Sequence, residues 1–238
     1  MSNTLNIAAY QFVPIADCAA LAAQLRAAAA ELKGTILVAP EGINLFVAGA
    51  PAAIEAFLAS VRVDARFAGM SVKRSHSQQV PFRRLLVKIK REIISLRAAG
   101  IDPARAPAPR IAPAELKALL DAGTPIVLLD TRNRFEVEIG TFRGALYLAL
   151  GSFGELPRKA HALPEELNQR TVVTFCTGGI RCEKAAPLLR TLGFADVRQL
   201  DGGILEYFER CGGAHFDGAC FVFDERGALD AALQPTVV

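Results

Sequence analysis

Residues 172–186 read VVTFCTGGIRCEKAA, and this stretch decides the fold of the second half of the chain. Its first residues are β-branched or aromatic and predict a buried strand, whereas its last residues favour a helix. A loop with a cysteine, two glycines and an arginine joins them. Because the amides of such a loop point at the positive end of the helix dipole, they stabilise an anion there. We therefore expect Cys176 to be a thiolate near neutral pH.

The sequence around this stretch alternates strands and helices, which predicts a doubly wound parallel sheet. Strands are expected at 125–130, 171–175 and 196–200, and helices at 114–121, 165–167, 182–192 and 204–210. Ligands of such sheets bind at the carboxyl ends of the strands. Asp130 and Arg132 follow one strand and Cys176 follows another, so we expect the first two to support a site built around the third.

The first part of the chain has a different order of elements. Strands are expected at 6–13, 35–39, 45–48, 71–75 and 85–89, and helices at 18–33, with Asp17 as its cap, and 51–61. The order β-α-β-β-α-β predicts a small ferredoxin-like α+β domain. Four prolines within residues 98–113 then predict an extended linker. We place the parts at 1–97 (ferredoxin-like domain), 98–112 (linker), 113–215 (parallel-sheet domain) and 216–238 (C-terminal extension).

The formal net charge of +3 hides an asymmetry along the chain. Residues 1–97 carry 12 Lys and Arg against 6 Asp and Glu, a balance of +6, whereas residues 98–238 carry 15 against 18, a balance of −3. The basic residues crowd at the end of the first part, at Lys73, Arg74, Arg83, Arg84, Lys88, Lys90 and Arg91. Such a cluster is typical of a phosphate-backbone binder, and the alternative is a solvated face.

The number of cysteines and the hydropathy of the chain indicate the cellular compartment that we expect. The five cysteines, Cys18, Cys176, Cys182, Cys211 and Cys220, are odd in number and scattered, which favours a reducing cytoplasm over a disulfide framework. No apolar run reaches the roughly 18 residues that a bilayer requires, so we expect no membrane association. The irregular spacing of Cys211, His215 and Cys220 is a weak metal signal, and we expect neither a metal nor an evident cofactor.

The spacing between Cys176 and Arg181 separates two chemistries. Cys-x4-Arg is one residue shorter than the loop of phosphatases that use a cysteinyl-phosphate, and the tighter cradle suits sulfur bound to the cysteine. The loop resembles the active-site loop of rhodanese domains. Further agreement comes from Asp130-Thr131-Arg132, Glu136, Gly140, Gly144-Ala145 and residues 200–204, so that this resemblance covers about residues 111–212.

The rhodanese resemblance implies roles for the loop residues. Cys176 would carry a persulfide, and Arg181 with the loop amides would stabilise its anionic sulfur. The loop itself comprises Thr177, Gly178, Gly179 and Ile180, with Cys182 directly after Arg181. Cys182 either resolves the persulfide, or forms a transient disulfide with Cys176, or is simply a small helix residue.

Longer sequence motifs point to one family among the proteins that contain a rhodanese domain. They comprise residues 41–44, 73–75, 130–133, 136–142, 175–184 and 220–226. Together they resemble the rhodanese-containing tRNA uridine hydroxylase family over nearly the whole chain. Many members continue into a tail with further cysteines, and we expect this sequence, which ends at Val238, to be a short form.

That resemblance implies an acylphosphatase-like first domain, a rhodanese domain, and oxygen-dependent 5-hydroxylation of the wobble uridine. It implies O2 as co-substrate and the anticodon region of tRNA as partner, with the basic residues as a tRNA surface. A sulfur donor or a thiol reductant is a further expected partner. The alternative function is that of a sulfurtransferase that works through a Cys176 persulfide. A non-catalytic binding module is a third possibility, which intact Cys176 and Arg181 disfavour.

Overall fold

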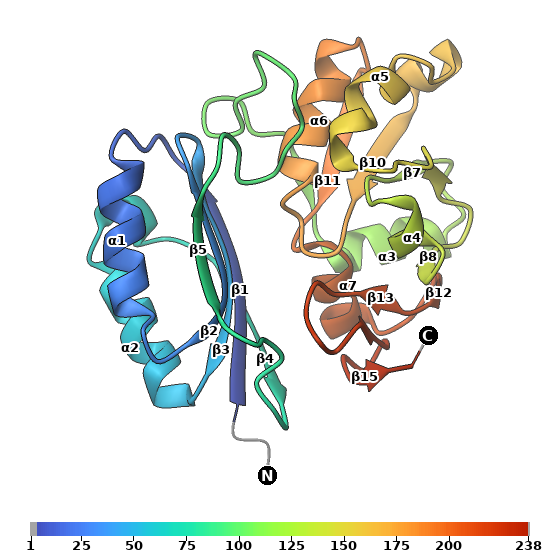
Figure 1. Ribbon diagram of the computed structural model, residues 1–238. Helices are drawn as coiled ribbons and strands as arrows, with labels where there is room; N and C mark the ends of the chain where they lie inside the picture. The colour runs from blue at the N-terminus through green and yellow to red at the C-terminus, as the bar shows by residue number, and fades with distance from the viewer. Residues whose placement is uncertain (1–3, 238) are drawn as a thin grey trace. The chain divides into compact units, whose positions relative to one another are not determined.

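The structure is a computed structural model that describes residues 4–237. It divides after Ile93 into two compact units, called unit 1 (Met1–Ile93) and unit 2 (Ile94–Val238), each of which is described by itself. Figure 1 shows unit 1 in blue to green and unit 2 in green to red.

Unit 1 is a five-stranded sheet with two helices on one face (Figure 1). Its elements are β1 (Thr4–Phe12), α1 (Cys18–Ala28), β2 (Lys33–Ala39), β3 (Gly42–Gly49), α2 (Pro51–Arg62), η1 (Ala65–Phe67), β4 (Val72–Ser77) and β5 (Leu85–Ile89). The strand order is β4-β1-β3-β2-β5, and only the β2–β5 pair is parallel. This confirms the ferredoxin-like prediction, and the fifth expected strand, β5, lies at one edge of the sheet.

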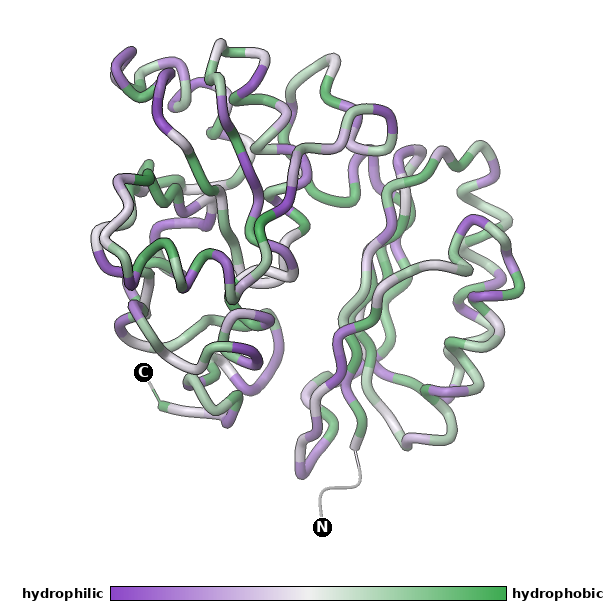
Figure 2. Tube along the Cα trace, turned by 180° about the vertical axis from the view of Figure 1, so that it is seen from behind, coloured by the Kyte–Doolittle hydropathy of each residue, from purple (hydrophilic) through white to green (hydrophobic). Residues whose placement is uncertain are grey.

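The helices of unit 1 each bury one side. Leu21 and Leu25 of α1 and Phe57 and Leu58 of α2 are buried in a core with the strands. Figure 2 shows the corresponding change between hydrophilic and hydrophobic residues along these helices. Burial of this apolar side supplies most of the stability of such helices.

Two expectations for the first helix are wrong. It ends at Ala28 instead of reaching residue 33, because β2 begins at Lys33 and runs very close to β3. A Cβ at Gly34 would lie 2.0 Å from the carbonyl oxygen of Phe46, so glycine permits this approach. Asp17 occupies the N-cap position but does not cap, because its carboxylate accepts a charge-assisted hydrogen bond from Arg66 at 2.9 Å.

Unit 2 is built on a five-stranded parallel sheet, as predicted. Its strands, in spatial order, are β6 (Arg110–Ile111), β11 (Asp196–Leu200), β10 (Thr171–Phe175), β7 (Val127–Asp130) and β9 (Leu146–Tyr147). Its helices are α3 (Pro113–Asp121), α4 (Arg134–Val137), η2 (Phe153–Glu155), α5 (Leu156–Ala160), η3 (Glu165–Gln169), α6 (Cys182–Thr191) and α7 (Gly203–Cys211).

Alternate residues of β10 pack into separate cores on the two faces of this sheet. Val173 and Phe175 pack with Leu116 of α3 and Ile204 of α7. Val172 packs on the other face with α6 and α5 residues such as Leu189 and Ala160. Burial on both faces explains the continuous apolar run of the sequence in β10.

Residues 94–112, which include the proline-rich segment, lie against unit 2. Leu96 is buried with Leu150 and Leu156, and Ala108 is buried in the core on the α6 face. Arg110–Ile111 then pair with β11 as the edge strand β6. The structure therefore assigns to unit 2 a segment that the sequence placed between domains.

The C-terminal extension forms small antiparallel sheets beside the parallel one. Its strands are β12 (Phe216–Gly218), β13 (Cys220–Phe221), β14 (Ala228–Leu229) and β15 (Pro235–Thr236), and β12 pairs with β8 (Gly140–Phe142). Among residues 4–237, no helix has both the length and the apolar character needed to cross a bilayer.

Candidate active site

The Cys176 loop joins the end of β10 to the start of α6, and a backbone N–H group of the loop contacts the Cys176 sulfur. Cys176 is fully buried, and its Sγ accepts a hydrogen bond from the N–H of Gly179 at 3.1 Å. Gly179 has a φ of +100°, a conformation that favours glycine. This donation from a backbone amide to the sulfur matches the anion cradle that the sequence predicts.

The first turn of α7 holds the loop from the other side. Ile204 N–H donates to the carbonyl of Cys176 at 2.9 Å, and Leu205 N–H donates to that of Thr177 at 3.1 Å. Gly203 allows this contact, because its φ is +66° and a Cβ there would lie 2.4 Å from the Cys176 oxygen. The Gly202-Gly203 turn of the sequence is therefore part of the loop's support.

The environment of Cys176 favours the thiolate. Burial alone would raise the pKa of Cys176, but three kinds of contact outweigh it and lower the pKa to about 6. These are the thiol hydrogen bond from Cys182, the positive charge of Arg181, and the backbone N–H groups of Arg181 and Gly179. The surroundings thus favour Cys176 as a thiolate, and its role as the nucleophile stays a prediction.

Cys182 stays protonated next to this thiolate. Burial and the neighbouring Cys176 raise the pKa of Cys182 well above its ordinary value. Its Sγ also lies 3.8 Å from the hydroxyl of Thr131. The structure therefore gives Cys182 the part of a thiol donor to Cys176, and its part in resolving a persulfide stays a prediction.

Arg181 is held by an acid for which the sequence suggested no role. Its guanidinium donates to both carboxylate oxygens of Glu136, at 2.6 and 2.7 Å, and both side chains are buried. Glu136 also accepts the N–H of Asn133 at 3.1 Å, at the start of α4. An acid three residues after an Asn is a helix-start signal, and it could have located this residue in the sequence.

Asp130 and Arg132 form a second buried pair at the end of β7. Their side chains meet at 2.7 Å and are completely buried. Arg132 also donates to the carbonyl of Gly140 at 2.6 Å, and Thr141 donates to Asp130 at 2.8 Å. Between them, Thr131 N–H donates to the carbonyl of Phe175 at 3.0 Å. The pair thus fixes the turn beside Cys176 without binding its sulfur in this structure.

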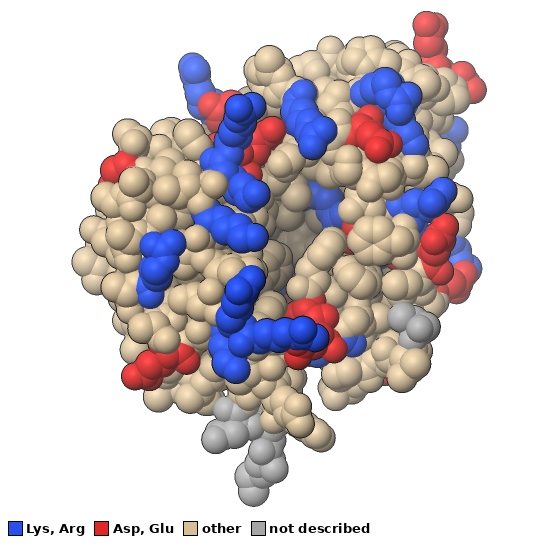
Figure 3. Space-filling view, viewed as in Figure 1, with Lys and Arg blue, Asp and Glu red and all other residues tan. Residues whose placement is uncertain are grey.

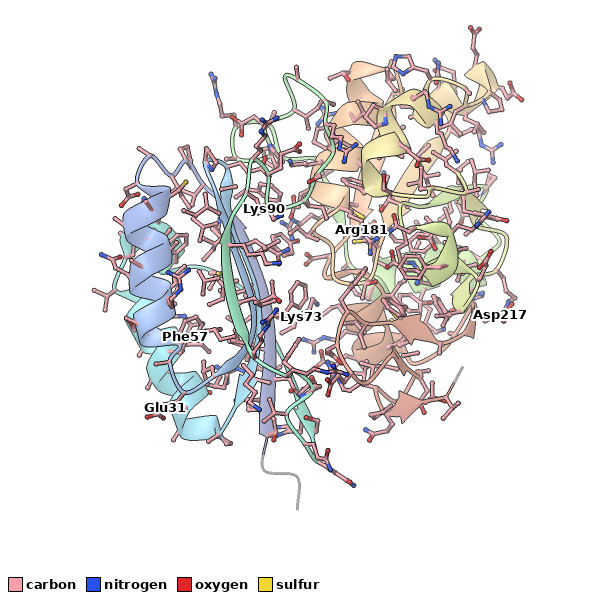
Figure 4. All side chains as sticks on the ribbon, viewed as in Figure 1. Glu31, Phe57, Lys73, Lys90, Arg181 and Asp217 are labelled. Carbon is pink, nitrogen blue, oxygen red and sulfur yellow. The ribbon has the colours of Figure 1, made fainter. Side chains whose placement is uncertain are left out.

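The C-terminal extension also reaches the loop. The carbonyl of Phe221 lies 3.5 Å from the Thr177 hydroxyl, and the Arg181 guanidinium lies 5.9 Å from the Phe223 ring centroid. Burial raises the pKa of Cys220, which precedes Phe221, to about 12. Figure 4 shows Arg181 where β10 leads into α6. Residues 220–226 were recognisable in the sequence as a family motif, but nothing in the sequence placed them at the Cys176 site.

The predicted basic cluster is divided between the two faces of the unit 1 sheet. Arg74 is in register with the core residue Ile7, and on the helix-covered face it binds Glu55 of α2. Lys73 and Lys88, which alternate with core-facing residues of β4 and β5, lie on the opposite face. Arg83, Arg84, Lys90 and Arg91 lie in the segments before and after β5. Figure 3 shows basic side chains gathered over unit 1, and Figure 4 labels Lys73 and Lys90.

The described residues hold no assembled metal centre. Within residues 4–237, no three His, Cys, Asp or Glu side chains converge as metal ligands. His215, one of the weak candidates, instead places its Nε2 2.7 Å from a carboxylate oxygen of Asp121.

Comparisons with known proteins match both units. Residues 4–93 match the model of the UPF0176 acylphosphatase-like domain, and residues 112–210 match that of the rhodanese-like domain. Among solved structures, the rhodanese-like domain of an Anabaena protein is 26% identical, with a TM-score of 0.39, over 46% of this chain and 79% of that one. A human single-domain sulfurtransferase is 30% identical, with a TM-score of 0.37, over 43% of this chain and 97% of that one.

Curated relatives match over nearly the full length. A tRNA uridine(34) hydroxylase of Bordetella parapertussis is 54% identical over 99% of each chain. One of Xanthomonas campestris is 54% identical, covering 98% of this chain and 94% of the relative. One of Cupriavidus taiwanensis is 50% identical, covering 97% and 84%. On this identity and on both domain matches, the chain belongs to the tRNA uridine(34) hydroxylase family.

Proposed function

We propose that this protein hydroxylates the wobble uridine of tRNA at C5, with O2 as co-substrate and Cys176 as the reacting side chain. One oxygen atom enters the base, and a thiol reductant supplies the two electrons that reduce the other to water. The observation that carries the proposal is the 54% identity, over 99% of both chains, to a relative named tRNA uridine(34) hydroxylase. The site supports it, because this chain keeps an activated cysteine in an intact cradle.

The three cysteines near the loop have different chemical states at neutral pH. A thiol with a pKa of about 6 is about nine-tenths thiolate at pH 7, so Cys176 is ready to act as a nucleophile. Cys182 and Cys220, whose pKa values are raised, remain thiols. Cys176 therefore reacts first, and Cys182 is the neighbouring thiol that can supply a proton or form a disulfide with it.

Unit 1 supplies the basic residues that we assign to tRNA binding. We propose that the anticodon region of the tRNA contacts unit 1. Its phosphates would bind the basic residues in and around β5, which are Lys88, Lys90, Arg83, Arg84 and Arg91. Lys73 lies on the same face of the sheet as Lys88. We expect Lys88→Ala to weaken binding of a tRNA and to reduce the slope of log affinity against log salt by about 0.7 to 0.9. Lys117→Ala, which removes an exposed lysine already paired with Asp121 at 2.6 Å, is the matched control and should leave the slope unchanged.

Nucleoside mass spectrometry tests the function itself. We expect tRNA from a deletion strain to lose 5-hydroxyuridine, and the wild-type gene to restore it. If deletion leaves the level unchanged and no second enzyme makes the nucleoside, the proposal is wrong.

Sulfur transfer is the second candidate function. It is favoured by the Cys-x4-Arg loop and by the match of residues 112–210 to the rhodanese-like domain. Thiosulfate or a persulfide donor would then load sulfur onto Cys176. Cyanide-dependent formation of thiocyanate, lost in Cys176→Ser, would support it, and its absence with either donor would argue against it.

A further inference from the structure

Three phenylalanine rings form an aromatic cluster beside the active-site loop. Phe135 comes from α4, and Phe221 and Phe223 come from the C-terminal extension. Their ring centroids are 5.0 to 6.5 Å apart, and each pair meets edge to face. Phe135 is 45% exposed and Phe223 is 57% exposed. Large apolar side chains left in water together mark a binding surface more often than an isolated one does.

The cluster contacts residues of the Cys176 loop. Arg181, five residues after Cys176, places its guanidinium 5.9 Å from the centroid of Phe223. The carbonyl of Phe221 lies 3.5 Å from the hydroxyl of Thr177, the residue after Cys176. Phe135 directly precedes Glu136, which binds Arg181. A group stacked on these rings therefore lies at the loop that carries the thiolate.

The charges around the rings are paired, which favours a neutral ligand. Arg181 is bound by Glu136 at 2.6 Å, and Asp224, next to Phe223, is bound by Arg226 at 2.6 Å. A phosphate would meet no unpaired charge from these four residues. A flat, uncharged group with a π-face fits better, because it can stack on the exposed rings.

We infer that the aromatic cluster is the stacking platform for the uracil base that reacts at Cys176. This inference rests on the proposed function, and it assigns Phe135 and Phe223 as positioning residues for the base. Proteins that recognise single-stranded RNA stack unpaired bases on aromatic side chains in this way. Two tasks are thus assigned to different parts of the chain: the basic residues of unit 1 bind the backbone, and the cluster in unit 2 holds the base.

The test compares two RNAs on three proteins. The probe is an anticodon stem-loop that carries uridine or an abasic nucleotide at position 34. We expect the wild type to bind the uridine RNA about tenfold more tightly than the abasic one, as one base–aromatic contact allows. Phe135→Leu/Phe223→Leu should bind both RNAs equally, and Phe135→Tyr/Phe223→Tyr should keep the preference.

A matched control variant tests whether the preference depends on this cluster, and a measurement in cells separates the stacking role from the proposed function. Tyr147→Leu removes a ring that is 48% exposed but outside the cluster, and it should keep the full preference. The inference is overturned if the wild type shows no preference, or if the leucine pair retains it. In cells, absence of 5-hydroxyuridine with the wild type would sink the proposed function, whereas equal levels with the leucine pair and the wild type would sink the stacking role alone.

Discussion

The substitution Glu136→Gln tests how the site holds Arg181. It removes one charge from a buried pair in which the guanidinium binds both carboxylate oxygens, at 2.6 and 2.7 Å. Arg181 stays charged, because the pair and the nearby thiolate raise its pKa above an already high value. The variant therefore leaves a positive charge buried without its partner, which is costly in a low-dielectric interior.

The expected loss is large. Breaking a buried ion pair from one side costs about 3–5 kcal/mol, and we take about 3 kcal/mol because glutamine still offers an acceptor oxygen. At ~2–4 °C per kcal/mol for a domain of this size, the melting temperature of unit 2 should fall by about 6–12 °C. Thermal unfolding followed by circular dichroism measures the shift.

Glu138→Gln is the matched control from the same helical turn. Glu138 pairs with Arg134 at 3.6 Å, but both side chains are about two-thirds exposed, at 66% and 69%. Such a pair contributes less than about 0.5 kcal/mol, so the melting temperature should move by no more than ~2 °C. Equal shifts for the two variants would contradict the account of the Arg181 site.

A double variant provides an internal check. In Glu136→Gln/Arg181→Leu the unpartnered charge is gone, so stability should recover part of what Glu136→Gln loses. Simple addition of the two single losses would mean that the pair is not coupled. That result would refute the reasoning as clearly as a small effect of the single substitution.

Further predictions concern the thiolate and the glycines. Thiolate absorbance near 240 nm should titrate with a midpoint near pH 6 and be absent in Cys176→Ser. Because this pKa lies below the ordinary 9.0, the folded protein binds fewer protons than the unfolded chain between these values. Relative to Cys176→Ser, its free energy of unfolding should therefore be highest above pH 9 and fall as the pH drops through about 6. Gly203→Ala places a Cβ 2.4 Å from the Cys176 oxygen, so it should lower the free energy of unfolding by more than ~2 kcal/mol and disturb the thiolate signal. Gly178→Ala is the control, because its Cβ would have no atom within 4 Å, and it should change the free energy of unfolding by no more than ~0.5 kcal/mol.

Much of the fold was predictable because local pattern and tertiary packing agree. β5, β10 and β11 have the predicted bounds. The apolar runs of β10 and β11 are followed by turns that contain glycine, at Gly178 and Gly202, and that of β5 is followed by charged residues. The first helix fails for the opposite reason. Its alanines favour a helix through residue 33, but pairing of β2 with β3 around Gly34 stops it earlier.

The site was predictable in its centre and not in its surroundings. Cys176, Arg181 and the glycines are contiguous in sequence, so their spacing alone predicts the cradle. Glu136 and Phe223 reach the same loop from 45 residues before and 42 residues after Arg181 (181 − 136 and 223 − 181). Contacts over such separations depend on the topology of the sheet, which no local pattern specifies.

The most direct test of the central claim is whether Cys176 is needed to oxidise the wobble uridine. The gene is expressed, as wild type and as Cys176→Ser, in a strain whose own tRNA lacks 5-hydroxyuridine. Mass spectrometry of the anticodon fragment should show uridine 34 heavier by one oxygen atom with the wild type and unchanged with Cys176→Ser. An oxidised uridine with both proteins, or with neither, would contradict the account.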